Sequence, residues 1–261
     1  MSTKLHWLSY GEGPDLVLLH GWGMNGAVWQ QTVESLQTDF RVHVVDLPGY
    51  GHSAEHHAED LSHIANLVVQ SAPKKAIWLG WSLGGLVATH IALNMPERVT
   101  KLITVASSPK FAAEKPWRGI QPNVLSAFSS QLLEDFSLTI ERFMALQAMG
   151  SPSARKDVKQ LKQAVLSRPQ PNSESLLVGL NILADVDMRD ALTSLSVPML
   201  RLYGRLDGLV PIKVANDLSE QLPHTQKFIF NQSSHAPFIT EHDEFCTQIR
   251  KFAHDESNVN I

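Results

Sequence analysis

A serine between glycines is the first residue whose surroundings could support chemistry. Gly80-Trp81-Ser82-Leu83-Gly84 has the G-x-S-x-G pattern, after the apolar run 77–79 and before a helical pattern over 86–95. Between a strand and a helix, this pattern makes a strained turn that projects the serine hydroxyl above the sheet, and the small glycines let strand and helix approach. We predict that Ser82 is a nucleophile. The alternative is a glycine-rich turn in which Ser82 only caps the helix.

A serine nucleophile needs a base, and the base needs a carboxylate to orient it. Asp207 follows the apolar run 199–203, and His235 follows the last such run, 227–230. The order serine, aspartate, histidine is the one expected after a nucleophile elbow. We therefore predict Asp207 and His235 as the partners of Ser82. Their alternatives are a turn aspartate and a surface histidine.

The oxyanion of an acyl-transfer reaction needs hydrogen-bond donors. His20-Gly21-Trp22-Gly23 follows the apolar run 16–19, and its glycines allow the backbone to bend. We expect the backbone amides of Trp22 and Leu83 to form this oxyanion hole. The alternative is an ordinary strand-end turn with His20 as a structural histidine. His20 precedes Ser82, which argues against it as the base, and we interpret Asp46 as a structural turn residue.

The elements that must position these residues alternate along the chain. Helical patterns lie between the apolar runs, which predicts βαβ units and an α/β fold with a mostly parallel central sheet flanked by helices. The expected strands cover 16–19, 42–45, 76–79, 102–105, 199–203 and 227–230, with an antiparallel edge strand within 3–10. The expected helices cover 27–37, 61–71, 83–94, 212–221 and 240–253.

The alternation stops after residue 109. Residues 111–190 carry Leu, Met, Phe and Gln at helical spacing, punctuated by prolines, and contain no convincing strand. We predict a helical lid over 111–190, inserted into a core formed by 1–110 and 191–261.

Composition narrows the class of protein. The 261 residues carry a net charge of −4, with 43% hydrophobic and 18% charged residues and one cysteine. No apolar run is long enough to span a membrane, and the first residues lack the apolar region of a secretory signal. We expect a cytoplasmic, monomeric enzyme or binding protein with no nucleic-acid or membrane partner, no internal disulfide and no multi-cysteine metal site.

Together these residues resemble the α/β-hydrolase superfamily over essentially the whole chain. A closer likeness, from about residue 5 to 250, is to the pimeloyl-acyl-carrier-protein methyl ester esterase family of biotin synthesis. The segments that carry it are Trp22, 80–88, 105–109, 141–143, 145–147, 202–204, 206–211 and 235–239. Members of that family remove the methyl group from a pimeloyl chain attached to its carrier protein.

The resemblance implies residue roles and no cofactor. It implies a catalytic triad of Ser82, Asp207 and His235. It also implies substrate contacts at Trp22, Ser82, Leu83, Phe143, Met144, Ala145, Leu146, Gln147 and His235. Neither a metal nor an organic cofactor is expected. From the residues alone, the apolar side chains of 143–149 could equally form the core of the lid.

A carrier protein is strongly acidic, so docking would need a local basic surface. Residues 142–171 contain six basic residues and one acidic residue, Asp157. Arg155, Lys159 and Lys162 fall on one face of a predicted helix whose opposite face is apolar. We predict a docking surface of Arg142, Arg155, Lys159 and Lys162. A solvated helix face is the alternative.

The function that we predict is a serine carboxylesterase that hydrolyses the methyl ester of pimeloyl-acyl-carrier protein. Two alternatives stay open. One is another serine hydrolase of this fold, such as a broad short-chain esterase, a lactonase or a carbon–carbon bond hydrolase. The other is a non-catalytic binding protein on this scaffold.

Overall fold

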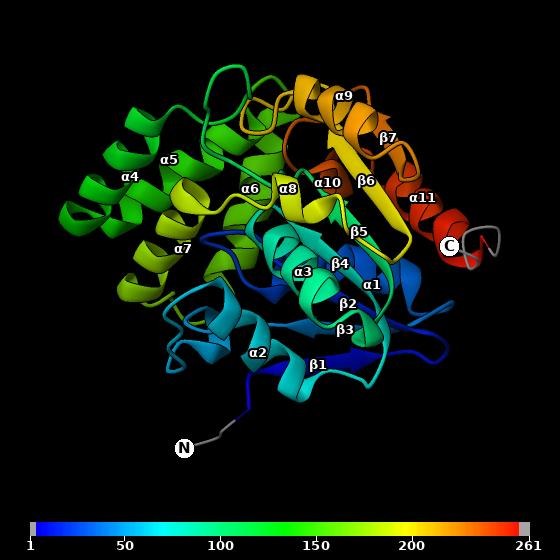
Figure 1. Ribbon diagram of the computed structural model, residues 1–261. Helices are drawn as coiled ribbons and strands as arrows, with labels where there is room; N and C mark the ends of the chain where they lie inside the picture. The colour runs from blue at the N-terminus through cyan, green and yellow to red at the C-terminus, as the bar shows by residue number, and fades with distance from the viewer. Residues whose placement is uncertain (1–3, 256–261) are drawn as a thin grey trace.

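One seven-stranded sheet forms the centre of the protein (Figure 1). The computed structural model describes residues 4–255. The strand order is β1-β3-β2-β4-β5-β6-β7, and only the pairing of β1 with β3 is antiparallel. The strands are β1 (Trp7–Tyr10), β2 (Asp15–Leu19), β3 (Arg41–Val45), β4 (Ala76–Trp81), β5 (Val99–Val105), β6 (Met199–Gly204) and β7 (Gln226–Phe230).

Burial on both faces explains the apolar strand sequences. Every residue of β4 and β6 is buried, as is all of β2 after Asp15. A parallel sheet covered on both sides requires such continuous apolar runs. The predicted α/β fold and mostly parallel sheet are confirmed, and the expected antiparallel edge strand is β1.

Helices cover both faces of the sheet. In Figure 1, α2 and α3 lie in front of the sheet and α1 behind it. These helices and those that follow the lid are α1 (Gln30–Leu36), α2 (Leu61–Ser71), α3 (Leu83–Asn94), α8 (Arg189–Leu192), α9 (Ile212–Gln221), α10 (Pro237–Thr240) and α11 (His242–His254). Short 3₁₀ turns are η1 (Gly26–Trp29), η2 (Gly51–Ser53) and η3 (Pro96–Arg98).

Two expected helices are divided. The helix expected over 27–37 consists of η1 and α1, because the Asn25 side chain accepts a hydrogen bond from the Ala27 amide and starts a 3₁₀ turn. The helix expected over 240–253 begins earlier as α10 and restarts at His242 as α11. None of the helices in the described part of the chain is both long and apolar enough to cross a membrane.

Besides the short α8, four helices lie between β5 and β6 in the chain, and these four gather at one end of the molecule, at the upper left of Figure 1. They are α4 (Pro122–Glu134), α5 (Phe136–Ala148), α6 (Ala154–Leu166) and α7 (Ser173–Asp185). Helix α4 packs against α5 and α7, and α5 packs against α6. We call α4–α7 the lid helices.

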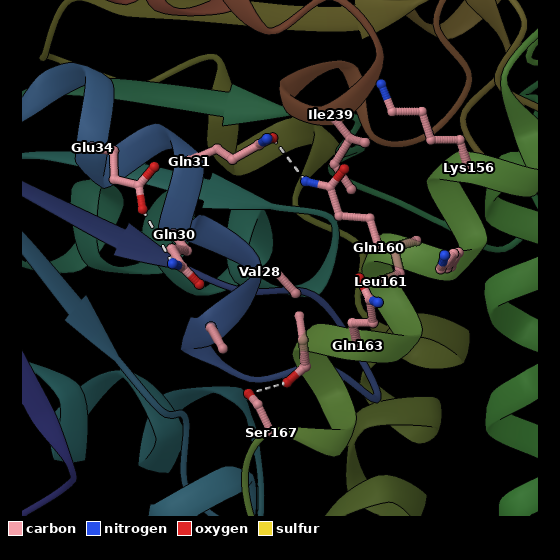
Figure 2. Close-up of a pocket in the computed structure, with 13 residues that line it drawn as sticks. Val28, Gln30, Gln31, Glu34, Lys156, Gln160, Leu161, Gln163, Ser167 and Ile239 are labelled. Atoms are coloured by element: carbon pink, nitrogen blue, oxygen red, sulfur yellow. Dashed lines mark hydrogen bonds between the residues drawn. The ribbon is translucent and has the colours of Figure 1, made fainter.

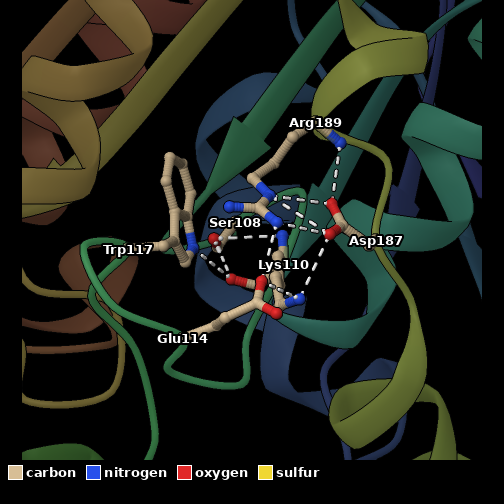
Figure 3. Close-up of polar contacts among 6 residues, drawn as sticks. All are labelled: Ser108, Lys110, Glu114, Trp117, Asp187 and Arg189. Atoms are coloured by element: carbon tan, nitrogen blue, oxygen red, sulfur yellow. Dashed lines mark hydrogen bonds and ion pairs between the residues drawn. The ribbon is translucent and has the colours of Figure 1, made fainter.

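An ion-pair network joins the two chain segments that lead into and out of the lid helices (Figure 3). Lys110 pairs with Glu114 at 2.7 Å and with Asp187 at 3.1 Å, and Arg189 pairs with the same two carboxylates at 2.9 and 2.7 Å. The hydrogen bonds from Arg189 hold the pKa of Asp187 below its usual value. The Arg189 guanidinium also lies 5.3 Å from the Trp117 ring centroid. These contacts tie residues 110–117 to 187–189.

Candidate active site

Ser82 lies at the turn between β4 and α3 in a strained conformation. Its backbone angles are φ 54° and ψ −117°, a region that a non-glycine residue occupies only when its surroundings impose it. A β-carbon on Gly80 would lie 2.1 Å from the Gly84 carbonyl oxygen, and one on Gly84 would lie 2.5 Å from the Leu19 carbonyl oxygen. The glycines therefore allow strand and helix to meet closely around Ser82, as the motif predicted.

Asp207 and His235 are in direct contact. The Asp207 Oδ2 atom lies 2.8 Å from His235 Nδ1, and both side chains are buried. The other carboxylate oxygen, Oδ1, accepts hydrogen bonds from the amides of Leu209 and Val210 at 2.8 and 3.1 Å. These amides fix the carboxylate, which in turn holds the imidazole with its proton on Nδ1.

Trp81, the neighbour of Ser82, joins the elbow to the loop that follows β7 and carries His235, which we call the histidine loop. Its indole Nε1 donates a hydrogen bond of 2.7 Å to the carbonyl oxygen of His235. His235 Nε2 is buried and has no hydrogen-bond partner among the described residues. With Nδ1 bound to Asp207, Nε2 is the nitrogen left to accept a proton. Ser82 is 1% exposed and His235 is fully buried.

The loop at residues 20–26, which we call the oxyanion loop, lies beside the elbow. A β-carbon on Gly21 would lie 3.3 Å from Ser82 Cβ. Within residues 4–255, neither the Trp22 amide nor the Leu83 amide donates a hydrogen bond. The two amides that the sequence singled out are therefore both unpaired, and both belong to segments in contact with Ser82.

His20 is a structural residue of this loop. Its Nε2 accepts a hydrogen bond from the Leu47 amide at 3.0 Å, so its proton resides on Nδ1, which contacts the Gly21 carbonyl oxygen at 2.9 Å. Burial lowers the pKa of His20 to about 4, and nearby Asp46 only partly opposes that shift. His20 is therefore neutral near pH 7 and both of its nitrogens are occupied.

Helix α5 contacts the site of Ser82, Asp207 and His235 through part of the predicted substrate segment, residues 143–147. The carbonyl oxygen of Gln147 accepts a hydrogen bond from the His235 amide at 3.1 Å. Both polar atoms of the Gln147 side chain are buried without a partner among the described residues. The Phe143 ring lies 4.7 Å from the Trp22 ring, centroid to centroid. Phe143 and Gln147 thus reach the site from the lid.

The other residues of that segment lie differently. Met144 is buried, Leu146 is half-buried and Ala145 is exposed. Ala145 therefore lies on the solvent side of α5, away from the face that carries Phe143 and Gln147.

The predicted basic surface is exposed, but its charges are not all free. Arg142, Arg155 and Lys159 are exposed, whereas Lys162 forms an ion pair with Glu141 of α5. Arg168, which the count of basic residues included, does not belong to this surface, because its Nη1 contacts the buried Asp46 carboxylate at 2.5 Å.

A groove of about 570 Å³ lies between α6 and α1, and Lys159 of the predicted basic surface is among the residues that line it (Figure 2). Gln31 and Gln160 form a hydrogen bond of 2.8 Å across it. The groove contains none of Ser82, Asp207 and His235.

Sequence reasoning missed two kinds of contact. The motif gives Trp81 only as a variable position, although its indole binds the His235 carbonyl oxygen. The sequence indicates only a turn at Asp46, although this residue also binds Arg168 of the lid region. The only local signal for Asp46 was its place at the end of a strand, where buried polar residues of α/β folds gather.

The fold and the serine site define the class of protein. A family model of the alpha/beta hydrolase fold matches residues 14–242, which confirms the predicted fold class. An esterase structure from Exiguobacterium antarcticum has a TM-score of 0.84 with 23% identity, and the match covers 95% of this chain and 94% of that one. At that identity the likeness shows the fold alone.

Much closer relatives share nearly the full length. The chain is 86% identical to the pimeloyl-acyl-carrier-protein methyl ester esterase of Vibrio parahaemolyticus, over 98% of this chain and all of the relative. It is 85% identical to the protein of the same name from Vibrio campbellii, over 97% of this chain and all of the relative. The chain therefore belongs to the pimeloyl-acyl-carrier-protein methyl ester esterase family of alpha/beta hydrolases, and the resemblance drawn from the sequence is confirmed.

Proposed function

We propose that the protein is a serine carboxylesterase that hydrolyses the methyl ester of pimeloyl-acyl-carrier protein, giving pimeloyl-acyl-carrier protein and methanol for biotin synthesis. The observation that carries this proposal is the 86% identity to an esterase of that name over nearly the whole chain. The contact between Asp207 and His235, beside the elbow of Ser82, supports the chemistry.

Acylation begins at the unpaired nitrogen of His235. Nε2 accepts the proton from the Ser82 hydroxyl as Oγ attacks the methyl ester carbonyl. Asp207 stabilises the imidazolium that forms, while its own two backbone hydrogen bonds keep it in place. The imidazolium then protonates the leaving methoxide, and methanol departs.

Deacylation repeats the sequence with water as the nucleophile. His235 Nε2 accepts a proton from water, which attacks the acyl carbon, and Ser82 leaves with that proton. In both steps the amides of Trp22 and Leu83 donate hydrogen bonds to the oxyanion. Each such donor contributes roughly 10²- to 10³-fold to turnover in serine hydrolases.

The acyl chain is assigned to the face of α5 that packs against the oxyanion loop. Phe143, Met144 and Gln147 face inward from α5, and Trp22 packs against Phe143. Leu146 borders this group, and Ala145 on the solvent side can contribute only through its backbone. The buried side-chain amide of Gln147 has no partner among the described residues, so it suits the polar ester end of a substrate better than its methylene chain.

Carrier docking is assigned to the exposed basic surface of α5 and α6, formed by Arg142, Arg155, Lys159 and Lys162. Arg142 lies on α5, which contacts His235 through Gln147, and the other three lie on α6, which packs against α5. An acidic carrier bound there would be close to the site. Charge attraction of this kind mainly speeds association.

The test compares two substrates on the purified protein. We expect kcat/KM to be at least about 100-fold higher for the pimeloyl-carrier methyl ester than for a short free methyl ester. This ratio means that contacts with the carrier and the acyl chain stabilise the transition state by about 2.7 kcal/mol or more. Equal values would indicate a broad esterase and remove the carrier from the proposal. A fluorophosphonate that fails to label Ser82 would favour the non-catalytic alternative.

A further inference from the structure

The lid reaches the oxyanion loop through Asn25. Its Nδ2 atom donates to the carbonyl oxygens of Ala164 and Val165, at 3.3 and 3.2 Å. These carbonyls belong to the last turn of α6, where they also accept hydrogen bonds from Ser167 and from the Arg168 amide. The Asn25 Oδ1 atom accepts from the Ala27 amide at 3.0 Å. One side chain thus connects the end of a lid helix to the end of the oxyanion loop.

Arg168, two residues beyond α6, makes a second connection. Its Nη1 contacts Asp46 Oδ1 at 2.5 Å, and the same oxygen accepts from the Gly26 amide at 2.7 Å. The other oxygen, Oδ2, accepts from the His52 amide at 2.8 Å. Asp46 is fully buried and the Arg168 side chain is 11% exposed. The carboxylate therefore bridges the lid region and the oxyanion loop.

A third contact involves Trp22, near the start of the oxyanion loop. Trp22 Nε1 donates to the Leu176 carbonyl oxygen of α7 at 2.8 Å. The residue whose amide is assigned to the oxyanion hole is therefore itself bonded to the lid. With Asn25 and Gly26, three positions of one short loop contact the end of α6, Arg168 beyond it through Asp46, and the first turn of α7.

We propose that Arg168 and Asn25 are positioning residues for the oxyanion hole, through which the end of α6 sets the placement of the Trp22 amide. Oxyanion donors act only when they are held at the position where charge develops, so a small displacement of the loop lowers turnover. Loss of Arg168 leaves a buried carboxylate without its cation, which the loop relieves by moving. Arg168 is therefore expected to affect kcat and not the binding of the carrier.

The test is the kinetic comparison of Arg168→Met and Arg168→Lys with wild type. This inference rests on the proposed function, so both the carrier-linked ester and a short free methyl ester are measured. Rates are expressed per active site, counted by the end point of fluorophosphonate titration, which removes unfolded protein from the comparison. Lys156→Met is the matched control, because Lys156 is an exposed cation of α6, the helix that Arg168 follows.

We expect Arg168→Met to lower kcat about 10-fold on both substrates with little change in KM, less than the loss of an oxyanion donor outright. Arg168→Lys recovers part of the loss because it restores the positive charge beside Asp46. Lys156→Met leaves the kcat for the free ester unchanged.

Two results would overturn the inference. An unchanged kcat per titrated site in Arg168→Met would reduce Arg168 to a stabilising role. A higher KM for the carrier-linked ester alone would make Arg168 a docking residue.

Asn25→Ala keeps the inference testable if Arg168→Met fails to fold. It must show the same fall in kcat, and a wild-type kcat in this variant contradicts the inference. If wild type hydrolyses only the free ester, the proposed function fails, while these comparisons still test the loop.

Discussion

At the scale of a residue, the two oxygens of the Asp207 carboxylate have different roles. One oxygen is held by two backbone amides of its own loop, and the other holds His235 Nδ1 at 2.8 Å. The proton of the imidazole is thereby placed on Nδ1, and Nε2 is left unprotonated. The serine reaction depends on that tautomer.

Asp207→Asn tests this division of roles. An asparagine keeps the shape but offers an amide to Nδ1, which favours the wrong tautomer and removes the negative charge beside the imidazolium. We expect kcat to fall about 10³- to 10⁴-fold with little loss of stability. Steady-state hydrolysis and urea unfolding of the same preparation measure the two effects. A near-normal kcat would show that His235 is oriented by other contacts.

His20 links protonation to folding. Burial depresses its pKa to about 4 in the folded protein, against 6.5 for an unfolded chain. Between these values the unfolded state binds more protons, so stability is lost as the pH falls through this window. The expected loss from pH 7 to pH 5 is about 2 kcal/mol from this residue.

The matching measurement is urea unfolding of wild type and His20→Asn at both pH values. Wild type should lose about 2 kcal/mol more than the variant between pH 7 and pH 5. Equal losses would mean that another group carries the pH dependence.

At the scale of an element, the elbow depends on close contact between β4, α3 and β2. A β-carbon on Gly84 would lie 2.5 and 2.6 Å from the carbonyl oxygens of Leu19 and His20, which belong to backbone and cannot rotate away. Gly208 offers a matched contrast, because a β-carbon there would meet no atom within 4 Å.

Gly84→Ala should therefore destabilise the protein by about 1–3 kcal/mol, the usual cost of overpacking. Gly208→Ala should change stability by less than about 0.5 kcal/mol. Urea unfolding of the two variants decides the matter. A Gly84→Ala protein as stable as Gly208→Ala would show that the elbow is loosely packed.

The elements differ in how far local sequence determines them. Helices α2, α3 and α9 have the bounds expected from apolar periodicity and glycine or proline punctuation, because those signals lie within the elements themselves. The division of 27–37 into η1 and α1 depends on a side-chain cap. The pairing of Arg168 with Asp46 joins residues 122 positions apart, and no local pattern distinguishes that arginine from the exposed cations of α6.

The candidate site shows the same contrast. Ser82, Asp207 and His235 could be predicted because each follows a strand in a recognisable order. The contact from Trp81 to the His235 carbonyl and the contact from Gln147 to the His235 amide depend on how the lid and the loops pack, so only the structure reveals them.

At the scale of the whole molecule, charge is unevenly placed. The chain carries a net charge of −4, yet Arg142, Arg155 and Lys159 are all exposed on two adjacent lid helices, α5 and α6. Attraction of an acidic carrier to such a surface weakens with salt, since the screening length is about 8 Å at physiological ionic strength.

The combined reversal Arg142→Glu, Arg155→Glu and Lys159→Glu should lower kcat/KM for the carrier-linked ester at least about 10-fold, chiefly through slower association. Hydrolysis of a short free ester should be unchanged. Lys213→Glu, a reversal at an exposed site on core helix α9, serves as the control. Equal loss on both substrates would indicate damage to the lid, and no loss on either would place the carrier elsewhere.

The most direct test of the central claim is methanol release from pimeloyl-carrier methyl ester by wild type and by Ser82→Ala. Wild type should release one methanol for each ester over many turnovers. Ser82→Ala should release none above background, although it folds and binds the carrier-linked ester. Methanol release by Ser82→Ala at the wild-type rate would contradict the assignment of Ser82 as the nucleophile, and with it the mechanism drawn from this site.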